Sequence, residues 1–119
     1  MTDPRRVLGA SGERAVARWY GARGYAVVDR NWRVREGEID LVLRRGRTLV
    51  FCEVKTRRGD AFGSPFDAVT ARKQQRLRSL ALQWLAAHGA GRVPIRFDVA
   101  AVTVAGDGRA AIEVRFGAF

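Results

Sequence analysis

The spacing of apolar and polar positions along the chain predicts two helices. In residues 9–23 apolar side chains recur at intervals of three and four, which is typical of a helix with one buried face, and Gly24 follows as a stop signal. A longer helix is expected from an N-cap at Thr70 to about His88. Residues 1–8 are polar and basic, and we expect them to be frayed.

The remaining segments alternate with a period of two, which is typical of strands. These segments are residues 25–34, 38–43, 48–56, 95–104 and 111–116. We expect a bulge at Asp29 and Arg30, and a four-residue hairpin loop at residues 44–47. The order of helix, three strands, helix and two strands predicts an α/β fold, with helices packed on a mixed sheet in a single domain over residues 1–119.

The register of the predicted hairpin decides which polar side chains meet. If Leu43 faces Thr48, Asp40 lies diagonal to Glu53 on the same face of the sheet, and Lys55 shares that face. On the strand 48–56, the odd-numbered residues from Leu49 to Lys55 should then lie on one face, and Val50, Cys52 and Val54 on the other.

Three carboxylates, from Glu38, Asp40 and Glu53, are expected to converge near the strand ends, with Glu38 secondary to Asp40. Close carboxylates repel one another, so they raise their pKa values or recruit a cation. Oxygen ligands without a His/Cys cluster suit Mg²⁺ or Mn²⁺, and the carbonyl of Val54 is a further candidate ligand. With Lys55 to stabilise developing charge, the set suits phosphodiester hydrolysis. The plainer alternative is a Glu–Lys ion pair on a wet sheet face.

Composition points to a polyanionic partner. The chain has 22 Lys and Arg against 12 Asp and Glu, a net charge of +10, so nucleic acid is the expected ligand. The 47% hydrophobic content excludes a disordered tail. Cys52 alone cannot form an internal disulfide and fits a buried position in a reducing compartment. Because no signal-peptide core or membrane-length apolar run is found, we expect a cytoplasmic protein.

Further polar candidates lie on the two helices and in one loop. Glu13 lies at the edge of the buried stripe, where it could point toward the site or be a solvated residue of the first turn. The basic residues Arg72, Lys73 and Arg76 of the second helix are candidates for phosphate contact, or form an ordinary solvated face. Residues 57–66, which include Arg57, are expected to be a loop that clamps substrate.

Several motifs spread over the chain resemble those of one family: Gly9-x-x-Gly12-Glu13, Gly24-Tyr25, Arg30-Asn31, Gly37-Glu38-Ile39-Asp40, Phe51-Cys52-Glu53-Val54-Lys55-Thr56-Arg57, Lys73 and Arg96-Phe97-Asp98-Val99. Together they resemble the YraN-like family of bacterial proteins from Gly9 to about Val104. That family looks like a branch of the PD-(D/E)XK nuclease superfamily, similar to archaeal Holliday-junction resolvases. The resemblance implies a restriction-endonuclease-like fold. It also implies that Asp40 and Glu53 bind metal, that Lys55 is catalytic, and that Glu13 completes the metal site.

Three functional hypotheses follow from these patterns. The first is a Mg²⁺-dependent DNA endonuclease, with branched or damaged DNA as candidate substrates and a homodimer as a candidate assembly. The second is a nucleic-acid-binding module that keeps a nuclease-like fold without turnover. The third is a small scaffold that docks on a partner through Trp32 or the C-terminal residues 116–119, for which core packing is the simpler explanation.

Overall fold

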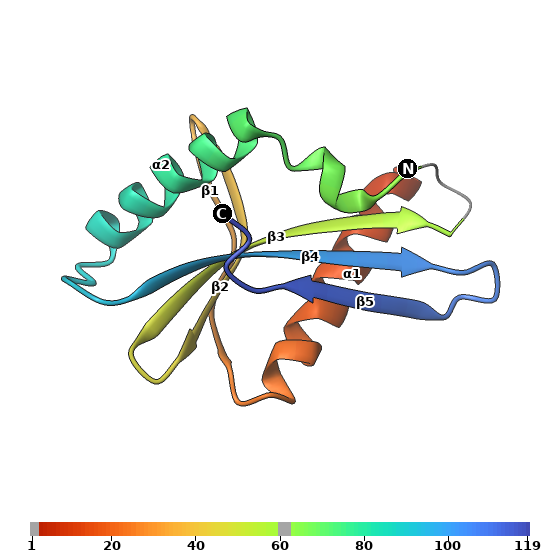
Figure 1. Cartoon of the computed structure of the whole chain (residues 1–119), viewed down its shortest axis with the longest axis horizontal. Helices are drawn as coiled ribbons and strands as arrows, with labels where there is room; N and C mark the ends of the chain where they lie inside the picture. The colour runs from red at the N-terminus through yellow and green to blue at the C-terminus, as the bar shows by residue number, and fades with distance from the viewer. Residues whose placement is uncertain (1–2, 60–62) are drawn as a thin grey trace.

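A computed structural model describes residues 3–59 and 63–119 (Figure 1). The elements in chain order are α1 (Pro4–Gly21), β1 (Ala26–Val34), β2 (Gly37–Arg45), β3 (Thr48–Arg58), the 3₁₀ helix η1 (Pro65–Ala68), α2 (Ala71–Ala87), β4 (Ile95–Val104) and β5 (Ala110–Arg115). The strands form one sheet in the order β1-β2-β3-β4-β5. Neighbouring strands are antiparallel except β3 and β4, which are parallel. The predicted mixed α/β fold is confirmed.

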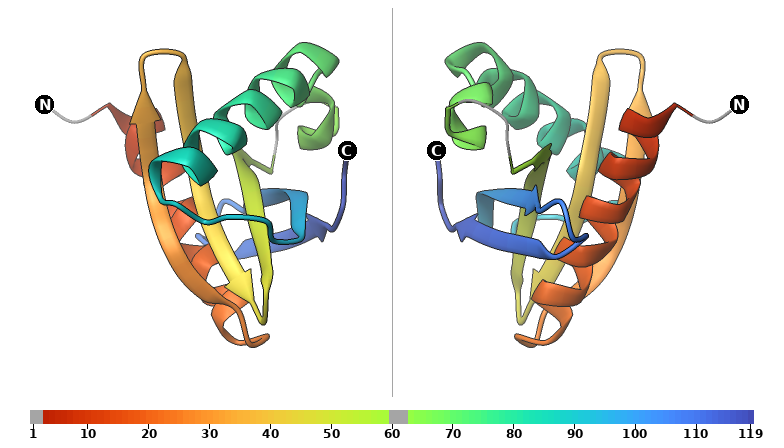
Figure 2. Two further views of the ribbon diagram at one scale, coloured as in Figure 1. Left: turned by 90° about the vertical axis from the view of Figure 1, so that its left-hand side faces the viewer. Right: turned by 90° about the vertical axis from the view of Figure 1, so that its right-hand side faces the viewer.

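The two helices lie on opposite faces of the sheet (Figure 2). On one face Val16, Ala17 and Tyr20 of α1 pack with Val50, Cys52 and Val54 of β3, in a cluster we call the α1 core. On the other face Leu77, Leu80, Ala81 and Trp84 of α2 pack with Leu49 and Phe51, in the α2 core. The predicted assignment of β3 side chains to the two faces is therefore confirmed for its apolar residues. Within the described ranges, neither helix is long and apolar enough to cross a membrane.

The predicted ends of the second helix are confirmed, whereas the predicted start of the first is wrong. Thr70 caps α2, and its Oγ1 accepts a hydrogen bond from the Lys73 N–H at 3.3 Å. α1 begins at Pro4, so residues 4–8 are helical and not frayed. Proline is favoured at the first helical position because a backbone N–H there would have no hydrogen-bond partner within the helix. The first helical hydrogen bond is donated by the Val7 N–H to the Asp3 carbonyl.

The expected register between β2 and β3 is wrong by two residues. Leu43 pairs with Val50, not Thr48, because the loop contains only Gly46 and Arg47, while residues 44 and 45 extend β2. Gly46 has a φ of +60°, a left-handed conformation that short hairpin turns require and glycine adopts readily. A shift of two residues does not by itself move side chains to the other face of the sheet.

The alternation of side chains breaks within β2, and the pairing of β1 with β2 is interrupted at a different level. Leu41 belongs to the α1 core, but Ile39, two residues before it, belongs to the α2 core. Strict alternation would place both on the same face. On β1 the predicted bulge lies at Val28, and not at Asp29 and Arg30 as expected. The pattern of apolar residues did not reveal the break, because Ile39, Leu41 and Leu43 recur along the chain with a regular period of two.

The predicted loop over residues 57–66 is only partly observed. β3 continues to Arg58, and η1 begins at Pro65. Residues 60–62 lie outside the described part of the chain, so the clamp remains a prediction. The candidate anchors of the scaffold hypothesis differ in their packing. Trp32 lies against the α2 core and the Phe119 ring stacks on Phe97 with centroids 5.1 Å apart, whereas Phe116 is 51% exposed.

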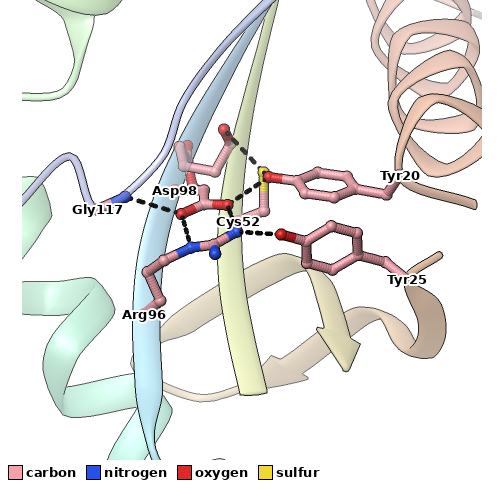
Figure 3. A network of polar contacts seen from close by, with 7 residues as sticks. Tyr20, Tyr25, Cys52, Arg96, Asp98 and Gly117 are labelled. Carbon is pink, nitrogen blue, oxygen red and sulfur yellow. Dashed lines mark hydrogen bonds and ion pairs between the residues drawn. The ribbon is translucent and has the colours of Figure 1, made fainter. Parts of the chain in front are cut away.

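A buried carboxylate joins the parts of the fold that are far apart in sequence (Figure 3). Asp98 of β4 is fully buried. Its two oxygens accept bonds of 2.8 Å each from the Arg96 guanidinium, one of 2.7 Å from the Tyr20 hydroxyl and one of 3.0 Å from the Gly117 N–H. A buried charge is tolerated only when it is paired and hydrogen-bonded, and Asp98 meets both conditions.

Cys52 lies beside this network as a buried side chain with no disulfide. Its Sγ is 3.6 Å from the Tyr20 hydroxyl, and burial raises the pKa of the thiol. A thiol that stays protonated is a poor nucleophile, which agrees with the prediction of a structural cysteine.

We predict that Tyr20→Phe lowers the free energy of unfolding by about 2 kcal/mol, because it removes a buried hydrogen bond to a charged group. Tyr25→Phe is the matched control. The Tyr25 hydroxyl accepts a bond of 2.9 Å from Arg96 but does not touch the carboxylate. Urea unfolding of both variants should show the larger loss for Tyr20→Phe. Equal losses would mean that the hydrogen bond to Asp98 adds little.

Candidate metal centre

The candidate site lies where β2 separates from β3. The last paired residues are Leu41 and Cys52, and Asp40 comes next, level with Glu53. There the Asp40 carboxylate accepts a hydrogen bond of 2.8 Å from the Val54 N–H. The Asp40 carboxylate thus takes the place of a backbone carbonyl as the acceptor for the Val54 N–H. This hydrogen bond from the neighbouring strand fixes the orientation of the Asp40 side chain.

α1 approaches β3 closely enough to bring Glu13 to the same place. A Cβ on Gly12 would lie 1.9 Å from Thr56 Oγ1, so only glycine fits between the helix and the strand. The next residue, Glu13, is consequently half-buried. Of the two interpretations of Glu13, the structure places it toward the site and not in open solvent.

Three carboxylates gather there from both faces of the sheet. One oxygen from each of Glu13, Glu38 and Asp40 lies within 4.8 Å of the others. Glu38 was expected to be secondary to Asp40, and the structure places it in this group with Asp40. Glu53 is not a member of the group, although its charge acts on both Glu13 and Asp40. The sequence could not rank Glu38, because its position depends on how β2 leaves the sheet.

Burial and repulsion between carboxylates make the carboxyl groups of Glu13 and Asp40 hard to ionise. Burial, and then the negative charge of Glu53, raise the pKa of Asp40 to about 8, against the opposing effect of the Val54 hydrogen bond. Burial also raises the pKa of Glu13, where a hydrogen bond from Asn31 opposes the shift. In the metal-free folded protein Asp40 therefore tends to keep its proton, and a bound cation would favour its ionised form instead.

The charge balance of the site suits a divalent cation. Glu38 pairs with Arg33 at 2.9 Å, and Glu53 pairs with Lys55 at 3.2 Å. Among the described residues, Glu13 and Asp40 have no ion-pair partner within 4 Å. When ionised, these two leave two negative charges uncompensated in a partly buried place. An all-oxygen set with this deficit fits Mg²⁺ or Mn²⁺.

A groove of about 130 Å³ lies between β2 and α2, and two carboxylates of the site line it. Glu38 and Glu53 line one side, and Lys73 and Arg76 of α2 line the other. Of the predicted basic residues, Lys73 and Arg76 thus line the groove, and Arg72 and Arg57 do not. Arg72 is exposed but does not line the groove, and Arg57 donates a hydrogen bond to the Gly63 carbonyl.

Residues 12–102 match the model of the uncharacterised protein family UPF0102. The chain belongs to this family. It is 52% identical over 112 residues to a UPF0102 protein of Frankia alni, an alignment that covers 94% of this chain and 93% of the relative. It is 54% identical over 106 residues to a UPF0102 protein of Beutenbergia cavernae, covering 89% of this chain and 90% of the relative. UPF0102 is the YraN-like family that the sequence motifs resemble, so the resemblance to this family is confirmed.

The matched range of this UPF0102 chain contains every residue of the candidate centre, from Glu13 to Lys55. Asn31 is a member of the site that residue patterns did not reveal. It stands in β1, and its side chain lowers the pKa of the Glu13 carboxyl against the larger effect of burial. An asparagine inside a run of strand residues was the available signal, because asparagine is disfavoured in strands.

We predict that Asp40→Asn stabilises the metal-free protein at pH 8. The folded state holds the Asp40 proton to about pH 8, whereas an unfolded aspartate releases it near 3.8. Between these pH values the folded state binds more protons than the unfolded state, so the free energy of unfolding falls as pH rises. Asparagine does not titrate, so Asp40→Asn removes that loss of stability. The gain should be about 1–2 kcal/mol, or roughly 5–10 °C in melting temperature.

Thermal melts of both proteins in EDTA at pH 5 and pH 8 provide the measurement. The difference between them should shrink at pH 5, where Asp40 is protonated in the folded protein. A variant that is less stable than the parent at pH 8 would contradict the raised pKa.

Proposed function

We propose that this protein is a divalent-metal-dependent nuclease that hydrolyses phosphodiester bonds in DNA. The observation that carries the proposal is the cluster of Glu13, Glu38 and Asp40 beside the Glu53–Lys55 pair, next to a groove that Glu38 and Glu53 line together with the basic residues Lys73 and Arg76. Mg²⁺ or Mn²⁺ fits the all-oxygen donor set, and the net charge of +10 favours a polyanionic substrate.

Each residue has a distinct task in this proposal. Glu13, Glu38 and Asp40 would hold the cation, with Glu53 next to them and the Val54 carbonyl as a further candidate ligand. When bound, Mg²⁺ or Mn²⁺ supplies Lewis-acid polarisation of the phosphodiester and a source of activated water. Asp40 must first lose its proton. Lys55 would donate hydrogen bonds to a phosphate oxygen as negative charge develops on it.

The basic wall of the groove would position the DNA backbone. Lys73 and Arg76 face Glu38 and Glu53 across the groove, so a phosphate held by them would lie beside the carboxylates. Arg72 is exposed on the same helix and would extend this surface. The resemblance to PD-(D/E)XK nucleases supports the assignment and makes branched DNA the first substrate to test. A two-fold dimer would present two such sites to a symmetric junction.

A non-catalytic DNA-binding module is the second candidate. The net charge of +10 supports binding with or without turnover. The 3.2 Å Lys55–Glu53 ion pair also favours it, because in the structure the lysine serves as a counter-ion. The two candidates differ in their need for a cation and for Asp40.

We predict cleavage of supercoiled or branched DNA in the presence of Mg²⁺ or Mn²⁺. Asp40→Asn and Lys55→Ala should each lower the cleavage rate by at least ~100-fold, since one removes a carboxylate ligand and the other the charge stabiliser. Arg109→Ala is a control on the exposed hairpin between β4 and β5. Cleavage that persists in Asp40→Asn would reject the proposed site. Metal-independent binding without cleavage would favour the second candidate.

We predict that Lys73→Ala weakens DNA binding and lowers the slope of log K against log salt by about 0.9, because one phosphate contact is lost. Arg76→Ala should act similarly. Arg109→Ala removes the same charge away from the groove and should leave the slope unchanged. Fluorescence anisotropy with labelled duplex at several salt concentrations measures the slope. Equal effects of all three substitutions would indicate that the groove does not direct binding.

A further inference from the structure

A second hollow of the surface lies at the C-terminal end of α2, whereas the groove beside the carboxylates lies along its N-terminal half. The volume of this hollow is about 430 Å³, which is within the usual range for small-ligand sites. The β2–β3 turn and the C-terminal end of α2 lie on the same side of the molecule, and residues of both line the hollow (Figure 1). Its apolar lining includes Val28, Leu49 and Val93. We call it the α2-end cavity.

The bulge in β1 supplies an exposed apolar side chain to this cavity. Val27, on one side of the bulge, packs against the α1 core. The next two residues both reach the α2 side, because Val28 lines the cavity and Asp29 accepts a bond of 2.8 Å from Trp84. A regular strand would send only one of two neighbours to that side. Val28 is 43% exposed, so its apolar surface is open to a ligand.

Two stacked rings form the aromatic part of the cavity lining. The His88 imidazole lies on the Trp84 indole with centroids 4.0 Å apart and planes inclined by 16°. Trp84 is buried, whereas the His88 side chain is 39% exposed, so His88 is the accessible member of the stack. The Asp29 carboxylate accepts the Trp84 N–H bond and lies 3.7 Å from His88 Nε2, so it holds both rings in place. A flat ring held in the lining of a cavity is a stacking surface for a planar ligand.

Two cations beside the rings determine which charge the ligand should carry. Arg44, at the end of β2, and Arg47, in the turn that follows, line the cavity and are exposed. Within the described ranges neither guanidinium makes an ion pair, and no carboxylate lines the cavity. An apolar cavity with an aromatic surface and two unpaired guanidinium groups matches a ligand that joins a planar ring to a phosphate, as a nucleotide does.

We propose that the α2-end cavity binds an unpaired nucleotide of the DNA. Its base would stack on His88, and its phosphates would bind Arg44 and Arg47. The proposal rests on the proposed function only in taking DNA as the ligand. A paired base is held in the duplex stack and is costly to remove, so the cavity selects DNA with a single-stranded arm.

The position of the cavity along α2 allows one DNA molecule to contact both sites. Lys73, in the groove beside the carboxylates, lies about 22 Å from His88 along the helix, at 1.5 Å per residue. A duplex end or branch point at the groove would therefore place an unpaired arm of a few nucleotides in the cavity.

The test is the affinity for a forked duplex with single-stranded arms, measured by fluorescence anisotropy in EDTA so that metal-dependent cleavage does not occur. The parent protein should bind this fork at least ~10-fold more tightly than the same fork with abasic arms, which keep the phosphates and lose the stacking. Val28→Glu places a carboxylate in the cavity and should abolish this preference. Leu82→Glu is the matched control, because Leu82 is 66% exposed on α2 and does not line the cavity, and it should keep the preference.

Two further sets of variants separate the stacking from the charge. His88→Ala should remove the preference for arms with bases, whereas His88→Phe keeps an aromatic ring and should retain it. Arg44→Gln combined with Arg47→Gln should weaken the binding of both forks and lower the slope of log K against log salt by about 1.4, because two phosphate contacts to a single strand are lost.

The outcomes distinguish this site from the proposed nuclease. Equal affinity of the parent protein for the two forks, a preference that survives Val28→Glu, or an equal loss in Leu82→Glu would overturn the nucleotide site and leave the metal centre and DNA cleavage unaffected. A parent protein that binds neither fork nor blunt duplex would instead overturn DNA as the ligand, and the proposed function with it.

Discussion

The position of α1 depends on the fully buried carboxylate of Asp98. Its bonds to Tyr20 of α1, to Arg96 of β4 and to Gly117 near the C-terminus connect three parts of the chain that are distant in sequence. Removing one partner from such a network leaves a buried charge or donor unsatisfied, which costs far more than a surface contact. The network holds the C-terminal end of α1, while the contact of Gly12 with Thr56 holds its first half against β3.

A fixed α1 is what brings Glu13 to the carboxylates of β2. The helix covers one face of the sheet, whereas the groove that leads to Glu38 and Glu53 opens toward α2 on the other. Ligands from the two layers can meet only because β2 leaves β3 beyond Leu41 and changes face at Asp40. One interruption of regular sheet geometry thus lies at the place where the chemistry is proposed, as is common for strained functional sites.

The same cluster has a cost in stability. Burial, and then the negative charges of Glu53, Glu13 and Glu38, raise the pKa of Asp40 to about 8. A domain of 119 residues has a small margin of stability, so an arrangement that opposes folding at neutral pH has no structural advantage. A bound divalent cation would reverse the penalty, because it replaces protons and repulsion with coordination.

The sequence by itself determined the features that depend on local chemistry. The cap at Thr70, the end of α1 near Gly24 and the separation of β3 side chains between two faces follow from short-range rules, and the structure agrees with them. Tertiary structure decided the register of the hairpin, the change of face at Asp40, and the inclusion of Glu38 with Glu13. These depend on how strands and helices from distant parts of the chain pack together, and the spacing of apolar residues along one segment contains no such information.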